Sequence, residues 1–114
     1  MDAKTAKRNR RKGHDFEREV VNVAKSHGFE VERGLQYRGG EEAPDVSVET
    51  LHGPLWIECK VRKNFSSASV CALLDDADAV AIKILNKGTF YAMSPDRFWR
   101  LLAVCERERR FSAR

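Results

Sequence analysis

The sequence contains no apolar run that approaches the ~20 residues required for a membrane-spanning helix. No apolar signal-peptide core follows its charged start. Internal repeats and low-complexity linkers are absent as well. These absences argue against a membrane protein and a repeat architecture, and we expect a cytoplasmic protein with no membrane partner.

Cysteine is also scarce. The three cysteines, Cys59, Cys71 and Cys105, are widely spaced, and each has apolar neighbours. No paired Cys or His spacing typical of a zinc site is present. We therefore expect all three to be small buried hydrophobic residues.

A chain of 114 residues is long enough for one hydrophobic core but not for two. Its 42% hydrophobic and 33% charged residues are typical of a folded globular domain rather than a disordered chain. We predict a single domain over residues 12–114, preceded by a basic flexible tail over residues 1–11.

The net charge of +4 is concentrated at the two ends. The segment "KTAKRNRRK", residues 4–12, holds six basic residues and no acid, and the last eight residues add four arginines. Such ends bind polyanions, above all nucleic acid, through counterion release. A solvated tail that only keeps the protein in solution is an equal alternative.

Hydrophobic periodicity predicts the remaining elements. Helical spacing indicates an amphipathic helix over residues 15–27 that ends at Gly28 and a second helix over residues 66–76. Alternating or apolar segments predict strands over residues 29–37, 45–51, 55–61, 79–85 and 89–93. Ser94 and Pro95 are typical of the start of a final helix. The expected fold class is therefore α/β, a mixed central sheet flanked by helices in the order α-β-β-β-α-β-β-α.

The final helix carries its own apolar stripe. Phe98, Leu101, Leu102 and Cys105 recur at helical spacing, and we expect this stripe to be buried. Trp99 lies off the stripe, which favours a protein interface over a place at the edge of the core.

The stretch "PDVSVETLHGPLWIECKV", residues 44–61, places charges inside an apolar pattern. Strand alternation assigns Ile57, Cys59 and Val61 to the core face and Glu58 and Lys60 to the opposite face. The same alternation in the preceding strand leaves Asp45 opposite the core.

Adjacent strands lie ~5 Å apart, so a suitable register brings Asp45 and Glu58 together. Two carboxylates that close need a cation, and oxygen ligands of this kind suit magnesium or manganese. Lys60 would then lie beside a phosphate or the attacking water. The alternative is an exposed ion pair between Glu58 and Lys60 with no catalytic meaning.

Pro44-Asp45 followed by Glu58-Cys59-Lys60 resembles the PD-(D/E)XK nuclease motif. The segment "KGHDFEREVVNVAKSHGFEVER", residues 12–33, is similar to the start of the archaeal-type Holliday-junction resolvases. The segment "AVAIKILNKGTFYAM" resembles the closing hairpin of that family, so the resemblance covers roughly residues 12–93. A smaller, phage-like branch of the family is one alternative. The longer loop before Asp45 and the final helix depart from the family pattern.

The resemblance implies a restriction-endonuclease-like fold and a metal-dependent endonuclease that resolves branched DNA. It implies that Glu17, Asp45 and Glu58, with the backbone carbonyl of Cys59, bind Mg²⁺, for which Mn²⁺ can substitute. Lys60 would be the catalytic lysine. We expect Glu17 to face the sheet and Glu19 to face solvent.

We expect DNA contacts from the basic segment, from the arginine that ends the first strand and from the loop before Asp45. The residues concerned are Lys7, Arg8, Arg10, Arg11, Lys12, Arg33 and Arg38. In that loop, Tyr37, Gly39 and Gly40 favour contact with a phosphate backbone only slightly over a mobile loop without function.

The expected partner is a four-way DNA junction, and the expected active species is a homodimer because two strands must be cut. Two alternatives remain open. One is a less selective nuclease that nicks duplex or damaged DNA. The other is a nucleic-acid-binding module without catalysis, against which the intact set of Asp45, Glu58 and Lys60 argues.

Overall fold

The computed structural model describes residues 3–33, 45–64 and 66–112 of the chain. Its elements are α1 (Ala3–Ser26), β1 (Glu30–Arg33), β2 (Val46–Thr50), β3 (Gly53–Arg62), α2 (Ser67–Leu73), β4 (Ala79–Ile84), β5 (Gly88–Ala92) and α3 (Pro95–Ser112). This order confirms the predicted α-β-β-β-α-β-β-α arrangement. No helix in the described ranges is long and apolar enough to cross a membrane.

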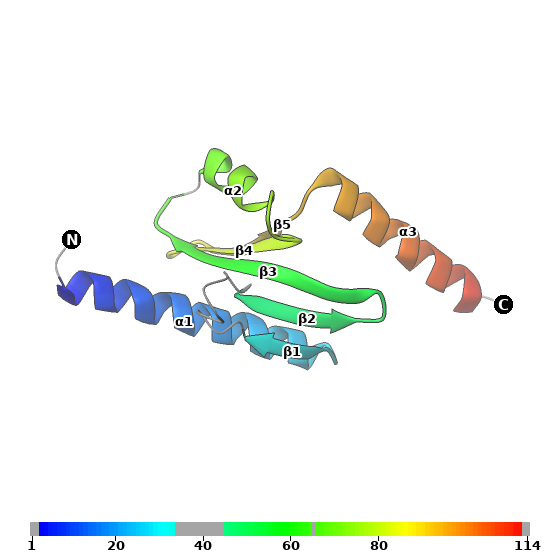
Figure 1. The fold of residues 1–114 in the computed structure, drawn as a ribbon, viewed down its shortest axis with the longest axis horizontal. Coiled ribbons are helices and arrows are strands. Elements are labelled where there is room, and N and C mark those ends of the chain that lie inside the picture. Colours follow the sequence, from blue (N-terminus) through cyan, green and yellow to red (C-terminus); the bar gives the residue numbers. More distant parts are fainter. Residues whose placement is uncertain (1–2, 34–44, 65, 113–114) are drawn as a thin grey trace.

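The five strands form one mixed sheet in the order β1-β2-β3-β4-β5 (Figure 1). Strands β3 and β4 pair in parallel, which their connection through α2 makes possible, and the other neighbours pair antiparallel. Strand β3 is therefore the centre of the sheet.

Each face of the sheet has its own hydrophobic cluster. On one face, Phe16, Val20 and Val21 of α1 pack against buried residues of β2, β3 and β4. On the other face, α2 covers Val80 and Ile82 of β4. Figure 1 shows α1 and α2 on opposite sides of the sheet. The predicted strand parity is confirmed, since Ile57 and Cys59 belong to the cluster under α1.

Helix α1 begins much earlier than predicted. The expected start near residue 15 is wrong, because the helix runs without a break from Ala3 to Ser26 and includes most of the predicted tail. Alanine, lysine and arginine are strong helix formers, so the basic segment extends the helix although it has no core to pack on. Apolar periodicity marked only the part of α1 that contacts the sheet.

Helix α3 is capped as predicted but packs differently. The Ser94 hydroxyl accepts a hydrogen bond from the Arg97 backbone N–H at 3.3 Å. The prediction of a buried stripe is wrong: the exposed fractions are 44% for Phe98, 50% for Leu101 and 43% for Leu102, and Cys105 is exposed too. The helix projects past the end of the sheet, so nothing in the described chain covers this stripe (Figure 1). Within residues 95–109, only Val104 is even half-buried.

The cysteine prediction is correct at one position of three. Cys59 is buried, whereas Cys71 and Cys105 are exposed on α2 and α3, and all three are free thiols. Apolar neighbours in the sequence do not bury a residue when the helix that carries it lies at the surface.

The molecule is elongated, with extents of 60 × 30 × 26 Å and a radius of gyration of 15.9 Å. A compact domain of this length has a radius of gyration of roughly 13 Å. The difference arises because the N-terminal part of α1 and the C-terminal part of α3 extend beyond opposite ends of the sheet (Figure 1).

Candidate active site

The register of β2 and β3 places Asp45 next to the centre of the sheet. The pairing runs to Val46 opposite Ile57, so the next position sets Asp45 against Glu58. Asp45 Oδ2 accepts a hydrogen bond from the Cys59 backbone N–H at 2.9 Å. This bond fixes the Asp45 carboxylate beside β3 and uses one of its two oxygens.

The backbone of β3 offers a further oxygen at this point. In an antiparallel pair, the N–H and C=O groups of one residue point to the same neighbouring strand. Because the Cys59 N–H points to Asp45, the Cys59 carbonyl is directed to the same side. Beyond Ile57, β3 continues to Arg62 with β4 as its only partner among the described strands.

Glu58 and Lys60 lie on the face of β3 turned away from α1. The parallel register pairs Glu58 with Val80 and Lys60 with Ile82, whose side chains form the cluster on that face. Both charged residues are half-buried. Trp56, two residues earlier on the same face, is 45% exposed, so α2 covers only part of this face.

Glu17 faces the sheet from α1, as expected, and is only 9% exposed. Its Oε2 accepts a hydrogen bond from Arg33 Nη2 at 3.1 Å. His14 Nδ1 lies 3.6 Å from the same oxygen and 3.3 Å from Arg33 Nη2. Arg33, which we expected to contact DNA, is therefore engaged by Glu17. The role of His14 was missed, although its i,i+3 spacing from Glu17 on a helix was a usable signal.

The electrostatics of Cys59 show which charges surround this point. Burial raises the pKa of the Cys59 thiol to about 12, and the carboxylates of Asp45, Glu17 and Glu58 contribute to this increase, while Lys60 acts in the opposite direction. The thiol is therefore neutral at physiological pH. The charges of the four candidate site residues therefore all influence the pKa of the buried Cys59 thiol.

The three acids do not converge on one point. In the parts of the chain that the structure describes, no group of three His, Cys, Asp or Glu residues could hold a metal ion. Glu17 is bound by Arg33 on the α1 side, whereas Glu58 lies on the opposite face. The oxygens nearest to one another along β3 are those of Asp45, which is bound to the Cys59 N–H, of Glu58, which follows Ile57 in the register, and of the Cys59 carbonyl. Such all-oxygen donors suit a hard divalent cation such as Mg²⁺.

Glu19 lies outside this site, as expected. Its side chain is 51% exposed, and its Oε1 pairs with Lys83 Nζ at 2.7 Å. Lys83 also lies over the Phe16 ring, 5.9 Å from its centroid. This pair is one of the polar contacts between α1 and β4.

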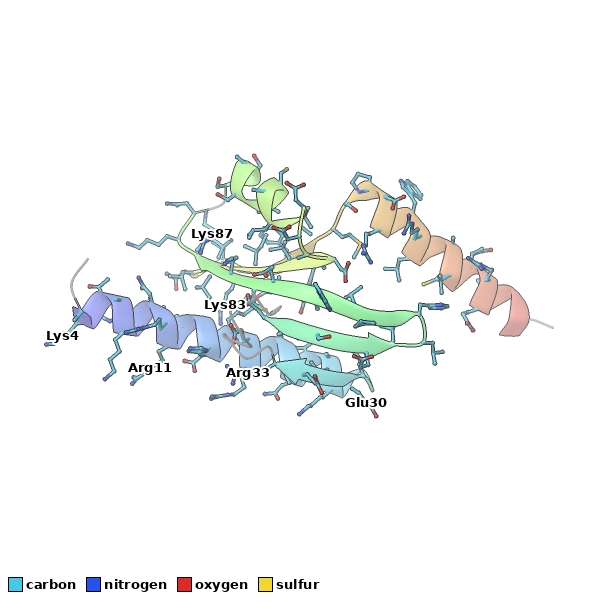
Figure 2. The ribbon with its side chains drawn as sticks, viewed as in Figure 1. Lys4, Arg11, Glu30, Arg33, Lys83 and Lys87 are labelled. Atoms are coloured by element: carbon cyan, nitrogen blue, oxygen red, sulfur yellow. The ribbon has the colours of Figure 1, made fainter. Side chains whose placement is uncertain are left out.

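The basic segment that we expected to contact DNA belongs to the N-terminal half of α1. Lys7, Arg8, Arg10, Arg11 and Lys12 are all exposed on α1. Figure 2 shows Lys4 and Arg11 projecting from the part of α1 that runs past the sheet. Arg38, with Tyr37, Gly39 and Gly40, lies outside the described residues.

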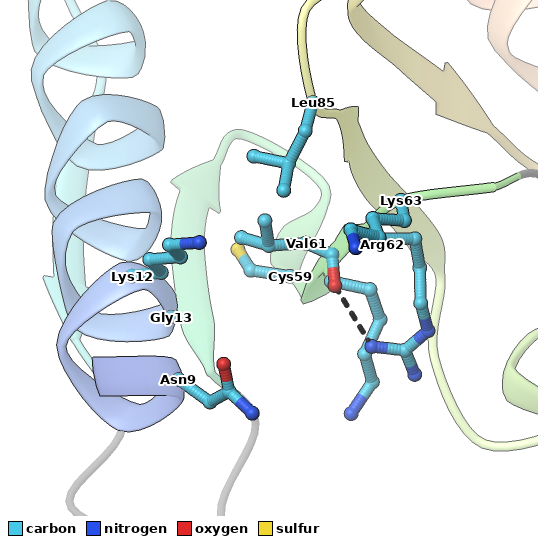
Figure 3. A pocket seen from close by; sticks show the side chains of 9 residues that line it. Asn9, Lys12, Gly13, Cys59, Val61, Arg62, Lys63 and Leu85 are labelled. Carbon is cyan, nitrogen blue, oxygen red and sulfur yellow. Dashed lines mark hydrogen bonds between the residues drawn. The ribbon is translucent and has the colours of Figure 1, made fainter. Parts of the chain in front are cut away.

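A cleft of about 530 Å³ lies between α1 and the end of β3 (Figure 3). Its lining includes Lys12, Lys60, Arg62 and Lys63. The last two residues were missed in the sequence, although "KVRK" at residues 60–63 places three cations in four positions at the end of the central strand. The cleft begins at Cys59, where Asp45 is bound.

Comparisons with known proteins identify the family and the fold. A family model described as archaeal Holliday junction resolvase (Hjc) matches residues 8–69, more than half of the chain. The solved structure of Hjc from Archaeoglobus fulgidus, a Holliday junction resolvase from an archaeal hyperthermophile, is similar with a TM-score of 0.50 and 26% sequence identity. That match covers 72% of each chain. No curated protein matches this chain.

Proposed function

The chain belongs to the archaeal Holliday junction resolvase family, and on that premise we propose that it cuts four-way DNA junctions by metal-dependent hydrolysis of phosphodiester bonds. The observation that carries this proposal is the bond from the Cys59 N–H to Asp45, in a register that sets Asp45 against Glu58. It supports a site in which two carboxylates and a strand carbonyl face one phosphate.

The roles of the residues follow from their positions. Asp45 and Glu58, with the Cys59 carbonyl, would hold Mg²⁺, or Mn²⁺ in its place. When bound, such an ion lowers the pKa of a water molecule and neutralises charge on the phosphate. Lys60, two residues along the same face as Glu58, stabilises the negative charge that develops on the phosphorus oxygens.

Glu17 has a supporting role in this proposal. Its carboxylate acts on the surroundings of Cys59, but its Oε2 is bound by Arg33. We assign Glu17 the role of positioning α1 against the site, and Arg33 the role of fixing the Glu17 carboxylate.

The decisive experiment incubates the purified protein with labelled four-way junction, fork and linear duplex, with Mg²⁺ or with a chelator. We expect paired cuts in the junction that require the metal. Equal cutting of all three substrates would instead indicate the less selective nuclease, and binding without any cut would indicate a non-catalytic module.

Removal of either carboxylate should give the largest loss of activity. We expect Asp45→Ala or Glu58→Ala to lower the cleavage rate at least about 100-fold, because a preorganised group at the reacting phosphate is removed. DNA binding should stay intact or become tighter, since repulsion of the phosphate is relieved. Glu49→Ala, an exposed acid on β2, is the matched control. Undiminished cutting by either site variant contradicts the assignment.

We propose that the active species is a homodimer, because a four-way junction presents two strands to be cut and each chain has one such site. Candidate interface residues are exposed: Trp99 is 65%, Tyr91 50% and Phe90 38% accessible. The uncovered stripe of α3 that includes Leu101 and Leu102 adds apolar area suited to a second copy of this chain.

Light scattering should give twice the 13.0 kDa chain mass. Leu101→Asp combined with Leu102→Asp should halve the measured mass without unfolding the chain, because both side chains are exposed. Mixed dimers of wild-type and Glu58→Ala chains should nick one strand but fail to resolve the junction. A monomer that still makes paired cuts refutes the dimer.

A further inference from the structure

We propose that the cleft between α1 and the end of β3 binds the DNA backbone next to the scissile phosphate, with Arg62 and Lys63 as phosphate-contacting residues. This inference rests on the proposed function and extends it, since neither residue belongs to the proposed catalytic set. The cleft borders that set directly, because Cys59 and Lys60 are part of its lining.

The charges of the cleft favour an anion. Lys12 from α1 and Lys60, Arg62 and Lys63 from β3 and its end contribute four cations, and no carboxylate is among the lining residues that the structure describes. In the described ranges, none of these four residues takes part in an ion pair, in contrast to Arg33 and Lys83. Four cationic residues that line one cleft give it a positive potential, which favours the entry of an anion.

The geometry suits an extended polyanion rather than a single ion. Lys60 and Arg62 are two residues apart, which corresponds to roughly 6.6 Å along a strand, or about two nucleotides of axial rise in a duplex. To the residues that the structure describes, Arg62 donates one side-chain hydrogen bond, from Nη1 to the Val61 carbonyl at 3.0 Å, and a guanidinium has five donors. Figure 3 shows Lys12 reaching from α1 toward β3, with Arg62 and Lys63 beyond Val61.

Gly13 provides an independent indication. It lies within α1 and lines the cleft, where a glycine weakens the helix relative to alanine. Packing does not require a glycine here, because a Cβ atom at this position would have no protein atom within 4 Å. The missing side chain leaves the helix surface open for the close approach of a ligand backbone.

The test scans a four-way junction with single methylphosphonates, which remove one phosphate charge at a time, and measures binding in the presence of a chelator. For the wild type, we expect neutral positions beside the scissile phosphate to weaken binding at least about 10-fold, the size of one charge-assisted hydrogen bond. Arg62→Ala combined with Lys63→Ala should bind more weakly and show no additional weakening at those positions.

Lys25→Ala combined with Arg109→Ala is the matched control, since it removes the same charges from exposed positions outside the cleft. This control should keep the full sensitivity of the wild type. If the Arg62 and Lys63 variant remains sensitive at the same positions, or if the control is weakened as much, the proposal is overturned. The scan needs no cleavage, so a wild type that shows the footprint but never cuts refutes the proposed catalysis and leaves the cleft assignment standing.

Gly13→Ala distinguishes an effect on DNA binding in the cleft from an effect on the stability of the fold. We expect a higher melting temperature, since alanine favours a helix, together with weaker junction binding, since the added methyl group enters the cleft. A higher melting temperature with unchanged binding would show that DNA does not approach this wall of the cleft.

Discussion

The two long helices of this protein, α1 and α3, carry similar apolar stripes but differ in how far these stripes are buried. In α1, Phe16, Val20 and Val21 are buried against the sheet, whereas in α3 the residues Phe98 and Leu101 remain about half exposed. Helix α1 crosses the sheet face that β2, β3 and β4 present, and α3 projects past its far end (Figure 1). The comparison teaches that an amphipathic pattern predicts a helix and a stripe but not the surface that covers the stripe.

The two ends also differ in their polar contacts. At the α1 end, Glu17 is almost buried and bound by Arg33, and the Lys83–Glu19 pair ties the helix to β4. At the α3 end, Arg97 pairs with Asp78, whose other oxygen accepts a bond from the Trp56 backbone N–H at 2.7 Å. Asp78 thus connects the start of α3 to the central strand, and only this first turn of the helix is anchored by an ion pair to another described element.

Matched phenylalanine truncations should give the largest contrast between the two helices. Phe16→Ala should lower the free energy of unfolding by about 3–5 kcal/mol, because it leaves a cavity in the core. Phe98→Ala should lower it by less than about 1 kcal/mol in the monomer, since this side chain is 44% exposed. Urea unfolding at low protein concentration measures both values. Equal decreases would mean that α3 packs on its own chain in solution.

Removal of each basic end in turn should give the second largest contrast, in DNA binding. Deletion of residues 1–11 should weaken DNA binding by about 100-fold, equally for different sequences, and lower the salt slope by about 0.9 for each phosphate that the protein no longer neutralises. Truncation of residues 107–114, which removes four arginines, should change the slope far less because α3 lies at the opposite end from the cleft. Binding titrations between low and moderate salt give both slopes. An unchanged salt slope after deletion of residues 1–11 would indicate that this segment only keeps the protein in solution.

Two arginine substitutions give the smallest expected contrast. Arg33→Ala should cost about 1–2 kcal/mol of stability, because Glu17 is only 9% exposed and would be left without its charged partner. Arg100→Ala should cost less than about 0.5 kcal/mol, since its pair with Asp96 is exposed on both sides. Thermal unfolding compares the two variants. A similar small effect for both would show that the Arg33 pair does not hold Glu17.

Much of the fold and part of the site follow from the sequence alone. The element order, the strand parity of Ile57 and Cys59, and the cap at Ser94 are local properties, set by alternation, helical spacing and side-chain chemistry. The approach of Asp45 to β3 also follows, because a short hairpin fixes the register of the two strands that it joins.

Only the tertiary structure decided the contacts between distant segments. The sequence predicted a DNA contact for Arg33 but gave no sign of its pair with Glu17, which the packing of α1 beside β1 creates. The cleft exists because α1 and the end of β3 lie side by side. Only this arrangement makes Arg62 and Lys63 part of the lining of a cleft. In the same way, Cys59 is buried and Cys105 is exposed because α1 covers the sheet and α3 does not. A local sequence pattern determines whether a segment forms a helix or a strand. Its burial and its ion pairs depend on which distant segment packs against it.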